Sequence, residues 1–468
     1  MATILQLVPS VGSTSATLDL NQVGFGLFQL MLSPEPAFPP PPLRRSTVGT
    51  LLTDGQTVPA SAYDNRTIAF TLRLLAASAG QKATALTGLG RELNKQNGVL
   101  RLQWSDASVA TWYRLLRSPS NPIRRLRPDG KALLVDVELV AEPFGLGAAV
   151  TVGPTTVNND PAAGSNGCFI DVTGVTGDVD TKPKIKMSAN SNNMAPILAV
   201  RRHGIVTDIA PLVQAEAATQ GTDTTTGADA LMSGGSRSRC SFATVATMAT
   251  RLTVDLPYSG GLPRTAARGN YRLWVMIASS NNTSVYALRQ RIVSGFGGSI
   301  PMLTGPTVTY TPTVANDRYL ADLDLFGVPV GPDPLYDGYG GEANCGGVQV
   351  QIQVQRVSGA GSLDLDFVAA MPADEETCRM ATTYLDIVLD GANNTIFTPG
   401  GFDEVTAASV PAIARDGGIP KLTPDQTNRI YILRPDGLGT GFVHGPDVKS
   451  RTASLTITWN PCYLTWAP

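Results

Sequence analysis

The stretch "SLDLDFVAAMPADEE", residues 362–376, contains the pattern that decides the fold class. Side chains of an extended strand alternate between two faces, so its two leucines and its phenylalanine share one side, and Asp364 and Asp366 share the other. The aspartates lie about 7 Å apart along such a strand, a separation that inverting glycosidases use between their two carboxylates. The same pattern describes a half-buried antiparallel strand with its aspartates in water, and we favour this interpretation because such alternation is how strands are built.

Alternation of this kind recurs along the chain and predicts a protein made mainly of β-strands. The clearest case is "VQVQIQVQ" (348–355), which places four β-branched residues on one face and four glutamines on the other. Further predicted strands are "RTIAFTLRLL" (66–75), "VLRLQW" (99–104), "ALLVDVELV" (132–140), "YRLWVMI" (271–277) and "SLTITW" (454–459). Many short strands separated by turns indicate sandwich or barrel architecture.

One helix is predicted, and it begins after residue 78. Ser78 opens the capping box "SAGQ", and Leu86, Leu89 and Leu93 then follow on a single apolar stripe. The Asn-Gly pair at 97–98 provides the expected C-terminal cap. The helix leads directly into the strand predicted at 99–104.

The composition narrows the class of protein. Charged residues make up 16% of the 468 residues, and 47 glycines and 34 prolines suit a β-rich globular chain with many turns. A net charge of −2 gives no overall attraction to nucleic acid or to anionic membrane. No signal peptide and no transmembrane helix are expected, so we expect a chain made in the cytosol with reduced thiols.

Motifs for catalysis and for metal binding are weak or missing, and we expect no enzyme, no cofactor and no metal site. Five cysteines without a Cys-X-X-Cys pair and only two histidines make a zinc site very unfavourable. No nucleophile elbow and no phosphate-binding loop is found. His203 and His444 are interpreted as loop or strand-end residues rather than general bases.

Two alternatives stay open beside this interpretation. Hard oxygen ligands could hold calcium, either at the paired aspartates or in the loop that carries Asp333, Asp337 and Glu342. Tyr336 and Tyr339 in the same loop are candidate carbohydrate-contacting residues, because aromatic rings stack on sugars; the competing interpretation is that they hold the loop against its own sandwich. The arginines of "SNPIRRLRPDG" (120–130) are interpreted as a solvated loop rather than a phosphate site.

A change in composition after "AEPFGLG" (141–147) predicts a domain boundary. We expect a β domain with one helix over residues 1–150, a β-sandwich over residues 160–400, and C-terminal strands over residues 401–468 that pack on either of them.

The order of segments in the first 150 residues resembles the ring-forming domain of distal tail (Dit-like) proteins of long-tailed, non-contractile phages. The resemblance lies in "YDNRTIAFTLRLLAAS" (63–78), the capped helix, "GVLRLQW" (98–104) and "LLVDVELVAEPFGLG" (133–147). Downstream, five segments resemble parts of minor tail proteins of actinobacterial phages. Those that resemble the galectin-like or carbohydrate-module-like sandwich are "GDVDTKPKIKMSA" (177–189), "RGNYRLWVMI" (268–277) and residues 362–376. Those that resemble the C-terminal end are "TNRIYILRP" (427–435) and "SLTITWNPCYLTWAP" (454–468). One departure is Cys462, where the resemblance leads us to expect a basic residue.

The resemblance implies a structural virion protein at the end of the phage tail, assembled in the host cytoplasm. Six copies of the first domain would form a ring that joins the tail tube to tip or baseplate proteins. The protein would bind no specific nucleic acid and would not insert into a membrane. Interfaces that close such rings bury apolar strands, and the expected face comprises Ile68, Phe70, Leu72, Val135, Val137 and Leu139. The alternative function is a carbohydrate-binding module that touches a host surface glycan.

Overall fold

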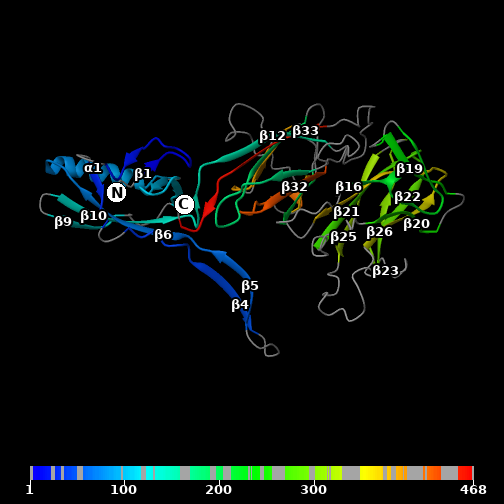
Figure 1. Cartoon of the computed structure of the whole chain (residues 1–468), viewed down its shortest axis with the longest axis horizontal. Helices are drawn as coiled ribbons and strands as arrows, with labels where there is room; N and C mark the ends of the chain where they lie inside the picture. The colour runs from blue at the N-terminus through cyan, green and yellow to red at the C-terminus, as the bar shows by residue number, and fades with distance from the viewer. Residues whose placement is uncertain are drawn as a thin grey trace. The chain divides into compact units, whose positions relative to one another are not determined.

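A computed structural model of the chain shows a protein built mainly of antiparallel β-sheets with one α-helix among its described residues, which confirms the predicted fold class (Figure 1). The structure describes residues 4–22, 27–32, 36–49, 56–95, 98–116, 123–129, 132–158, 169–189, 197–203, 212–229, 232, 235–242, 247–255, 269–294, 301–313, 315, 318–328, 348–372, 377–380, 386–393, 395–397, 415–416, 419–433 and 452–465. The chain forms two compact units. Unit 1 contains Met1–Val150, Thr176–Thr181 and Trp459–Pro468, and unit 2 contains Thr151–Val175 and Lys182–Thr458.

Unit 1 contains two larger antiparallel sheets. The six-stranded sheet has the order β2 (Leu18–Asp19), β1 (Ile4–Val8), β7 (Val99–Gln103), β8 (Thr111–Arg114), β11 (Gly145–Leu146), β34 (Cys462–Tyr463). The four-stranded sheet has the order β3 (Phe28–Leu30), β6 (Arg66–Leu74), β10 (Ala132–Ala141), β9 (Ile123–Asp129). The apolar faces of both sheets contribute to one core cluster.

The single helix α1 (Ala79–Leu93) packs on this core through Leu89 and Leu93. Its predicted start is confirmed, because the Ser78 side chain accepts a hydrogen bond from the Gln81 amide at 3.2 Å. The predicted end is wrong. The helix ends at Leu93, and Asn94 caps it: the Asn94 side-chain amide donates to the Gly90 carbonyl at 2.7 Å.

A two-stranded hairpin is the third sheet of unit 1. It consists of β4 (Leu43–Gly49) and β5 (Gln56–Tyr63), which pair with each other and with no other described strand. Figure 1 shows the hairpin extending away from the two larger sheets of its unit. At its base Arg44 forms an ion pair with Asp64, and Tyr63 meets Phe144 edge to face at 5.3 Å between ring centroids.

Unit 2 begins with a pair of five-stranded sheets. One has the order β12 (Val150–Asn158), β33 (Thr452–Trp459), β14 (Lys184–Ala189), β29 (Asp386–Asp390), β30 (Thr395–Phe397). The other has the order β13 (Phe169–Val172), β32 (Thr427–Leu433), β15 (Ile197–His203), β28 (Thr377–Met380), β31 (Arg415–Asp416). Strands β15 and β28 are neighbours in the second of these sheets, although 173 residues of sequence lie between His203 and Thr377.

That intervening sequence forms an inserted sandwich of two sheets. We call the first the aspartate sheet; its order is β18 (Thr224–Ala228), β19 (Ser236–Cys240), β27 (Leu363–Pro372), β21 (Gly269–Ser279), β25 (Arg318–Val328), with β16 (Leu212–Gln214) also paired to β27. We call the second the glutamine sheet; its order is β17 (Thr219–Gln220), β20 (Ala249–Asp255), β26 (Val348–Ser358), β22 (Val285–Ser294), β23 (Pro301–Thr304), with β24 (Val308–Tyr310) also paired to β22. A short 3₁₀ turn, η2 (Ala215–Ala217), links β16 to β17.

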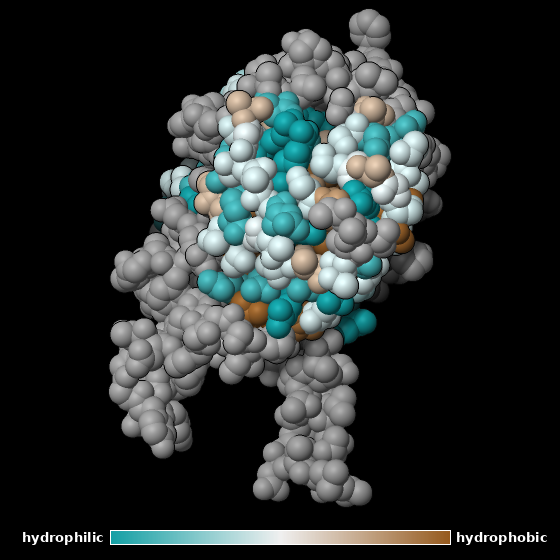
Figure 2. All heavy atoms as spheres, turned by 90° about the vertical axis from the view of Figure 1, so that its right-hand side faces the viewer, coloured by the Kyte–Doolittle hydropathy of each residue, from teal (hydrophilic) through white to brown (hydrophobic). Residues whose placement is uncertain are grey.

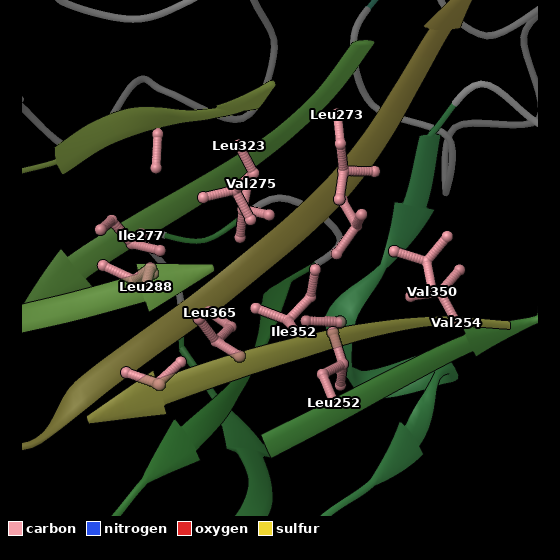
Figure 3. Close-up of a cluster of buried hydrophobic side chains, with 14 of the residues drawn as sticks. Leu252, Val254, Leu273, Val275, Ile277, Leu288, Leu323, Val350, Ile352 and Leu365 are labelled. Atoms are coloured by element: carbon pink, nitrogen blue, oxygen red, sulfur yellow. The ribbon is translucent and has the colours of Figure 1, made fainter. Parts of the chain in front are cut away.

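The core of the inserted sandwich confirms the period-two reading of its strands. Figure 3 shows side chains from both sheets meeting between them, among them Leu273 and Val275 of β21 and Val350 and Ile352 of β26. These four side chains are fully buried. Alternating sequence therefore identified these core-facing residues of β21 and β26.

Candidate functional site

The two aspartates of 362–376 do not face water, and that prediction is wrong. Asp364 is 3% exposed and Asp366 is 1% exposed. Leu363 and Leu365 face the core as expected, but Phe367 does not belong to the core cluster, whereas Val368 does. The alternation breaks because β27 contains a bulge: Met276 pairs with Phe367 and Ile277 with Leu365, which leaves Asp366 as the extra residue.

Arginines from other strands of the same sheet neutralise both aspartates. Arg239 of β19 donates to the two carboxylate oxygens of Asp364 at 2.7 and 2.8 Å, and Arg237 lies 3.7 Å from the same carboxylate. Arg318 of β25 lies 3.9 Å from Asp366 and is itself buried. The hydrogen bonds that Arg239 donates to Asp364 raise the pKa of the Arg239 guanidinium above its ordinary value.

The same outward face of the aspartate sheet carries two more ion pairs. Arg237 also pairs with Asp229, and Arg272 pairs with Asp322 at 2.7 Å while its guanidinium lies over the Trp274 ring. A glycosidase needs one carboxyl group free to donate a proton and a route for the substrate. Asp364 offers neither, since both of its oxygens accept from Arg239 and its side chain is buried. This arrangement is typical of a structural ion-pair network.

The six apolar residues expected to form an oligomer or core face lie inside unit 1. Ile68, Phe70, Leu72, Val135, Val137 and Leu139 are at most 4% exposed and belong to its core cluster. Strand β6 pairs with β10 in register over this face, with Phe70 opposite Val137. An interface between copies would therefore have to use other surfaces of unit 1.

Exposed apolar side chains of unit 1 mark such surfaces at the two edges of the four-stranded sheet and at the hairpin base. Leu27 and Leu32 flank the edge strand β3 and are 44% and 55% exposed, and Leu126 on the opposite edge strand β9 is 49% exposed. Leu43 and Tyr63 face each other across the hairpin base and are also exposed. Open strand edges with apolar residues are sites where another chain can pair.

The C-terminal segment is part of unit 1 and closes one edge of the six-stranded sheet. Gly145 of β11 pairs with Tyr463 of β34, and a Cβ at Gly145 would lie 2.5 Å from the Thr111 Cγ2 atom, so only glycine fits this approach. Arg66, which is fully buried, donates to the carbonyls of Leu464 and Pro143. Burial lowers the pKa of Arg66 below its ordinary value.

Cys462 occupies the position where the resemblance suggested a basic residue. Its carbonyl accepts a hydrogen bond from the Asp178 amide at 2.8 Å, and its side chain is buried beside Thr181. A cation at this position would be desolvated, and a salt bridge from this side chain is not available to cysteine.

Several sequence candidates lie outside the described residues: Tyr336, Tyr339, Asp333, Asp337, Glu342 and His444. His203 is the last residue of β15. Of the basic cluster, Arg127 pairs with Asp136 at 2.7 Å and Arg125 is exposed on the same edge strand. Within the described part of the chain, no group of three or more histidine, cysteine, aspartate or glutamate side chains could hold a metal ion, and no helix is long and apolar enough to span a membrane.

One face of the molecule, seen in Figure 2, is mainly hydrophilic or neutral where its residues are described. Hydrophobic residues appear there in small separate groups. The described part of this face therefore lacks the broad apolar patch that obligate interfaces bury.

No protein-family model matches the chain, and no curated protein gives a significant match. Among solved structures, the chain is similar to the Dit protein of phage SPP1, described as a paradigm of the hub adsorption apparatus in phages that infect Gram-positive bacteria, with 10% identity, 99% of both chains covered and a TM-score of 0.35. It is also similar to the phage P2 baseplate in its activated conformation with calcium (9% identity, 80% of this chain and 99% of that chain, TM-score 0.24). A Paenibacillus xanthan lyase gives 9% identity over 85% of this chain and 36% of that chain, with a TM-score of 0.25.

The first two structures come from the class of phage tail-end proteins that the sequence resembles. At TM-scores of 0.35 and below, however, neither they nor the lyase can assign a function to this chain. The actinobacterial type suggested by the sequence stays a prediction.

Proposed function

We propose that the chain is a structural protein of the end of a phage tail, in which six copies of unit 1 form a ring between the tail tube and the tip or baseplate proteins. The proposal starts from the sequence resemblance over residues 63–147. The observation that carries it is the hairpin β4–β5, which pairs with no other described strand. A two-stranded hairpin alone is marginally stable in water at best, so a partner from outside the chain would stabilise it.

The positions of the exposed apolar residues support head-to-tail contacts. Leu32 and Leu126 lie at opposite edges of one four-stranded sheet. If one edge of a copy meets the other edge of the next copy, the contact is heterologous. Such contacts close into a ring when the rotation from one copy to the next divides a full turn evenly. Backbone groups at both edges would then find partners, and the leucines would leave water.

The oligomeric state of the full chain tests the proposal. Sedimentation velocity and native mass spectrometry should give a species of six times the chain mass of 49.2 kDa. Two variants should shift it toward the monomer: Leu126→Asp, and a shortened hairpin in which an Asn-Gly turn replaces residues 45–61 and leaves Arg44 beside Ala62.

Leu325→Asp is the matched control, because Leu325 is 51% exposed in unit 2 and Leu126 is 49% exposed in unit 1. Circular dichroism should show that all variants keep their β structure. A folded wild-type chain that stays monomeric at micromolar concentration would contradict the proposal, as would equal loss of assembly in the Leu126 and Leu325 variants.

A further inference from the structure

The outward face of the glutamine sheet is built from polar side chains in two cross-strand rows. One row joins Thr253, Gln351, Arg291 and Thr304 through the register of four adjacent strands. In the second row, Thr250, Gln353 and Arg289 are neighbours on three strands. Neighbouring strands lie about 4.8 Å apart and alternate residues of one strand about 7 Å apart, so the rows form a continuous polar surface.

Hydrogen bonds within this surface fix four of its side chains before any ligand arrives. Arg289 donates from Nε to the Gln353 side-chain oxygen at 2.8 Å, and the Gln353 amide donates to the Thr250 hydroxyl at 3.4 Å. Thr250 in turn donates to the side-chain oxygen of Gln351 at 3.3 Å. A binding surface that is already ordered loses less side-chain entropy on binding.

Both cations of this surface lack a carboxylate among the described residues. Arg289 and Arg291 form no ion pair there, and Arg291 forms no side-chain hydrogen bond with any residue that the structure describes. Both are partly exposed. On the opposite sheet of the same sandwich, Arg239, Arg272 and Arg318 each lie beside an aspartate. The glutamine sheet thus presents two positive charges to which an anion is complementary.

We propose that the outward face of the glutamine sheet binds an acidic polysaccharide, a sugar chain whose carboxylate groups meet Arg289 and Arg291 and whose hydroxyls meet the glutamine and threonine side chains. A guanidinium matches a carboxylate with two parallel hydrogen bonds. Amide side chains both donate and accept, as sugar hydroxyls do. The rows include no large apolar side chain, which the buried centre of a protein–protein interface would need.

This binding goes beyond the proposed structural role and does not depend on ring formation. The test is affinity electrophoresis of the full chain at about 0.15 M salt, where the screening length is about 8 Å and long-range attraction is weak. Alginate, polygalacturonate and hyaluronate are the acidic polysaccharides, dextran is the neutral one, and polyacrylate is a polyanion without sugar. We expect retardation by at least one acidic polysaccharide and none by dextran.

Variants locate the binding surface. Arg291→Gln should weaken binding about tenfold, and Arg289→Gln with Arg291→Gln should weaken it further, since each removes a charge-assisted hydrogen bond. The matched control is Lys182→Gln with Lys186→Gln, which removes two charges from exposed lysines elsewhere in unit 2. Sedimentation should stay unchanged in every variant, so that loss of binding is separable from loss of assembly.

The following results would overturn the inference. They are no retardation of the wild-type chain by any of the three acidic polysaccharides, equal retardation by polyacrylate, equal retardation by dextran, and an arginine variant that binds as the wild type does. A lysine control that loses as much affinity as the arginine variant would assign the attraction to net charge and overturn it as well.

Discussion

The two sheets of the inserted sandwich share one core and differ on their outward faces. On the aspartate sheet, arginines and aspartates from different strands pair, and Asp364, Asp366 and Trp274 are almost completely buried. On the glutamine sheet the two outward polar rows consist of neutral amides, hydroxyls and two arginines, and most of these side chains are partly exposed. Opposite charges on adjacent strands allow a polar face to leave water, whereas like charges without counterions keep a face hydrated.

Replacing one partner of the buried pair gives the largest expected effect. Arg239→Ala leaves the Asp364 carboxylate buried, with only Arg237 at 3.7 Å to offset it, and should lower the free energy of unfolding by about 3–5 kcal/mol. Asp364→Ala should cost less, about 1–2 kcal/mol, because the Arg239 side chain is 36% exposed and can reach water. Hydrogen exchange of the β21 and β27 amides measures both values. Equal losses in the two variants would mean that the burial of Asp364 does not set the cost.

The positions of the strands could be predicted from the sequence, but the burial of the polar face of β27 could not. Period-two alternation located β6, β10, β21, β26 and β33, because one side of each strand faces a core. It could not show that Asp364 meets Arg239, since the register between residues so distant in sequence depends on the whole sheet. A signal was present nonetheless: "SRSRC" (236–240) spaces two arginines as "LDLD" spaces two aspartates.

The sequence did not reveal the bulge in β27, and it left open which of the two larger domains the C-terminal strands join. The bulge at Asp366 shifts Phe367 out of the core-facing series, and no local residue preference marks it. The return of residues 459–468 to unit 1 rests on the pairing of Gly145 with Tyr463 and on the burial of Arg66. Contacts across more than 300 residues follow from tertiary packing rather than from local pattern.

A partly exposed arginine–aspartate pair lies on unit 1 and predicts a smaller, pH-dependent effect. Burial acts to raise the pKa of Asp136, but hydrogen bonds from Arg127 and Thr71 outweigh it and leave the pKa below its ordinary value. A carboxyl group whose pKa is lower in the folded chain stabilises the fold at pH values above its pKa in the unfolded chain, about 3.9. This contribution is lost as the pH falls through the pKa of the folded chain. Asp136→Asn should therefore flatten the acid side of the stability curve of unit 1.

Urea unfolding between pH 2 and pH 6 measures how steeply the free energy of unfolding falls with acid. Asp106→Asn is the control, because Asp106 is an exposed residue in a turn of the same unit and forms no ion pair with any residue that the structure describes. An unchanged slope in the Asp136 variant would show that the contacts with Arg127 and Thr71 contribute nothing to the ionised form.

The glutamine sheet should give the smallest change in stability. Gln351→Val keeps a residue suited to strands and removes one long hydrogen bond of 3.3 Å from Thr250, on a face that stays partly hydrated. We expect the free energy of unfolding to change by no more than about 0.5 kcal/mol, as is usual for substitutions away from buried networks. Hydrogen exchange of the β22 and β26 amides checks this value. A loss comparable to that of Arg239→Ala would mean that the two outward faces are equally structural and that the polar rows are not free for a ligand.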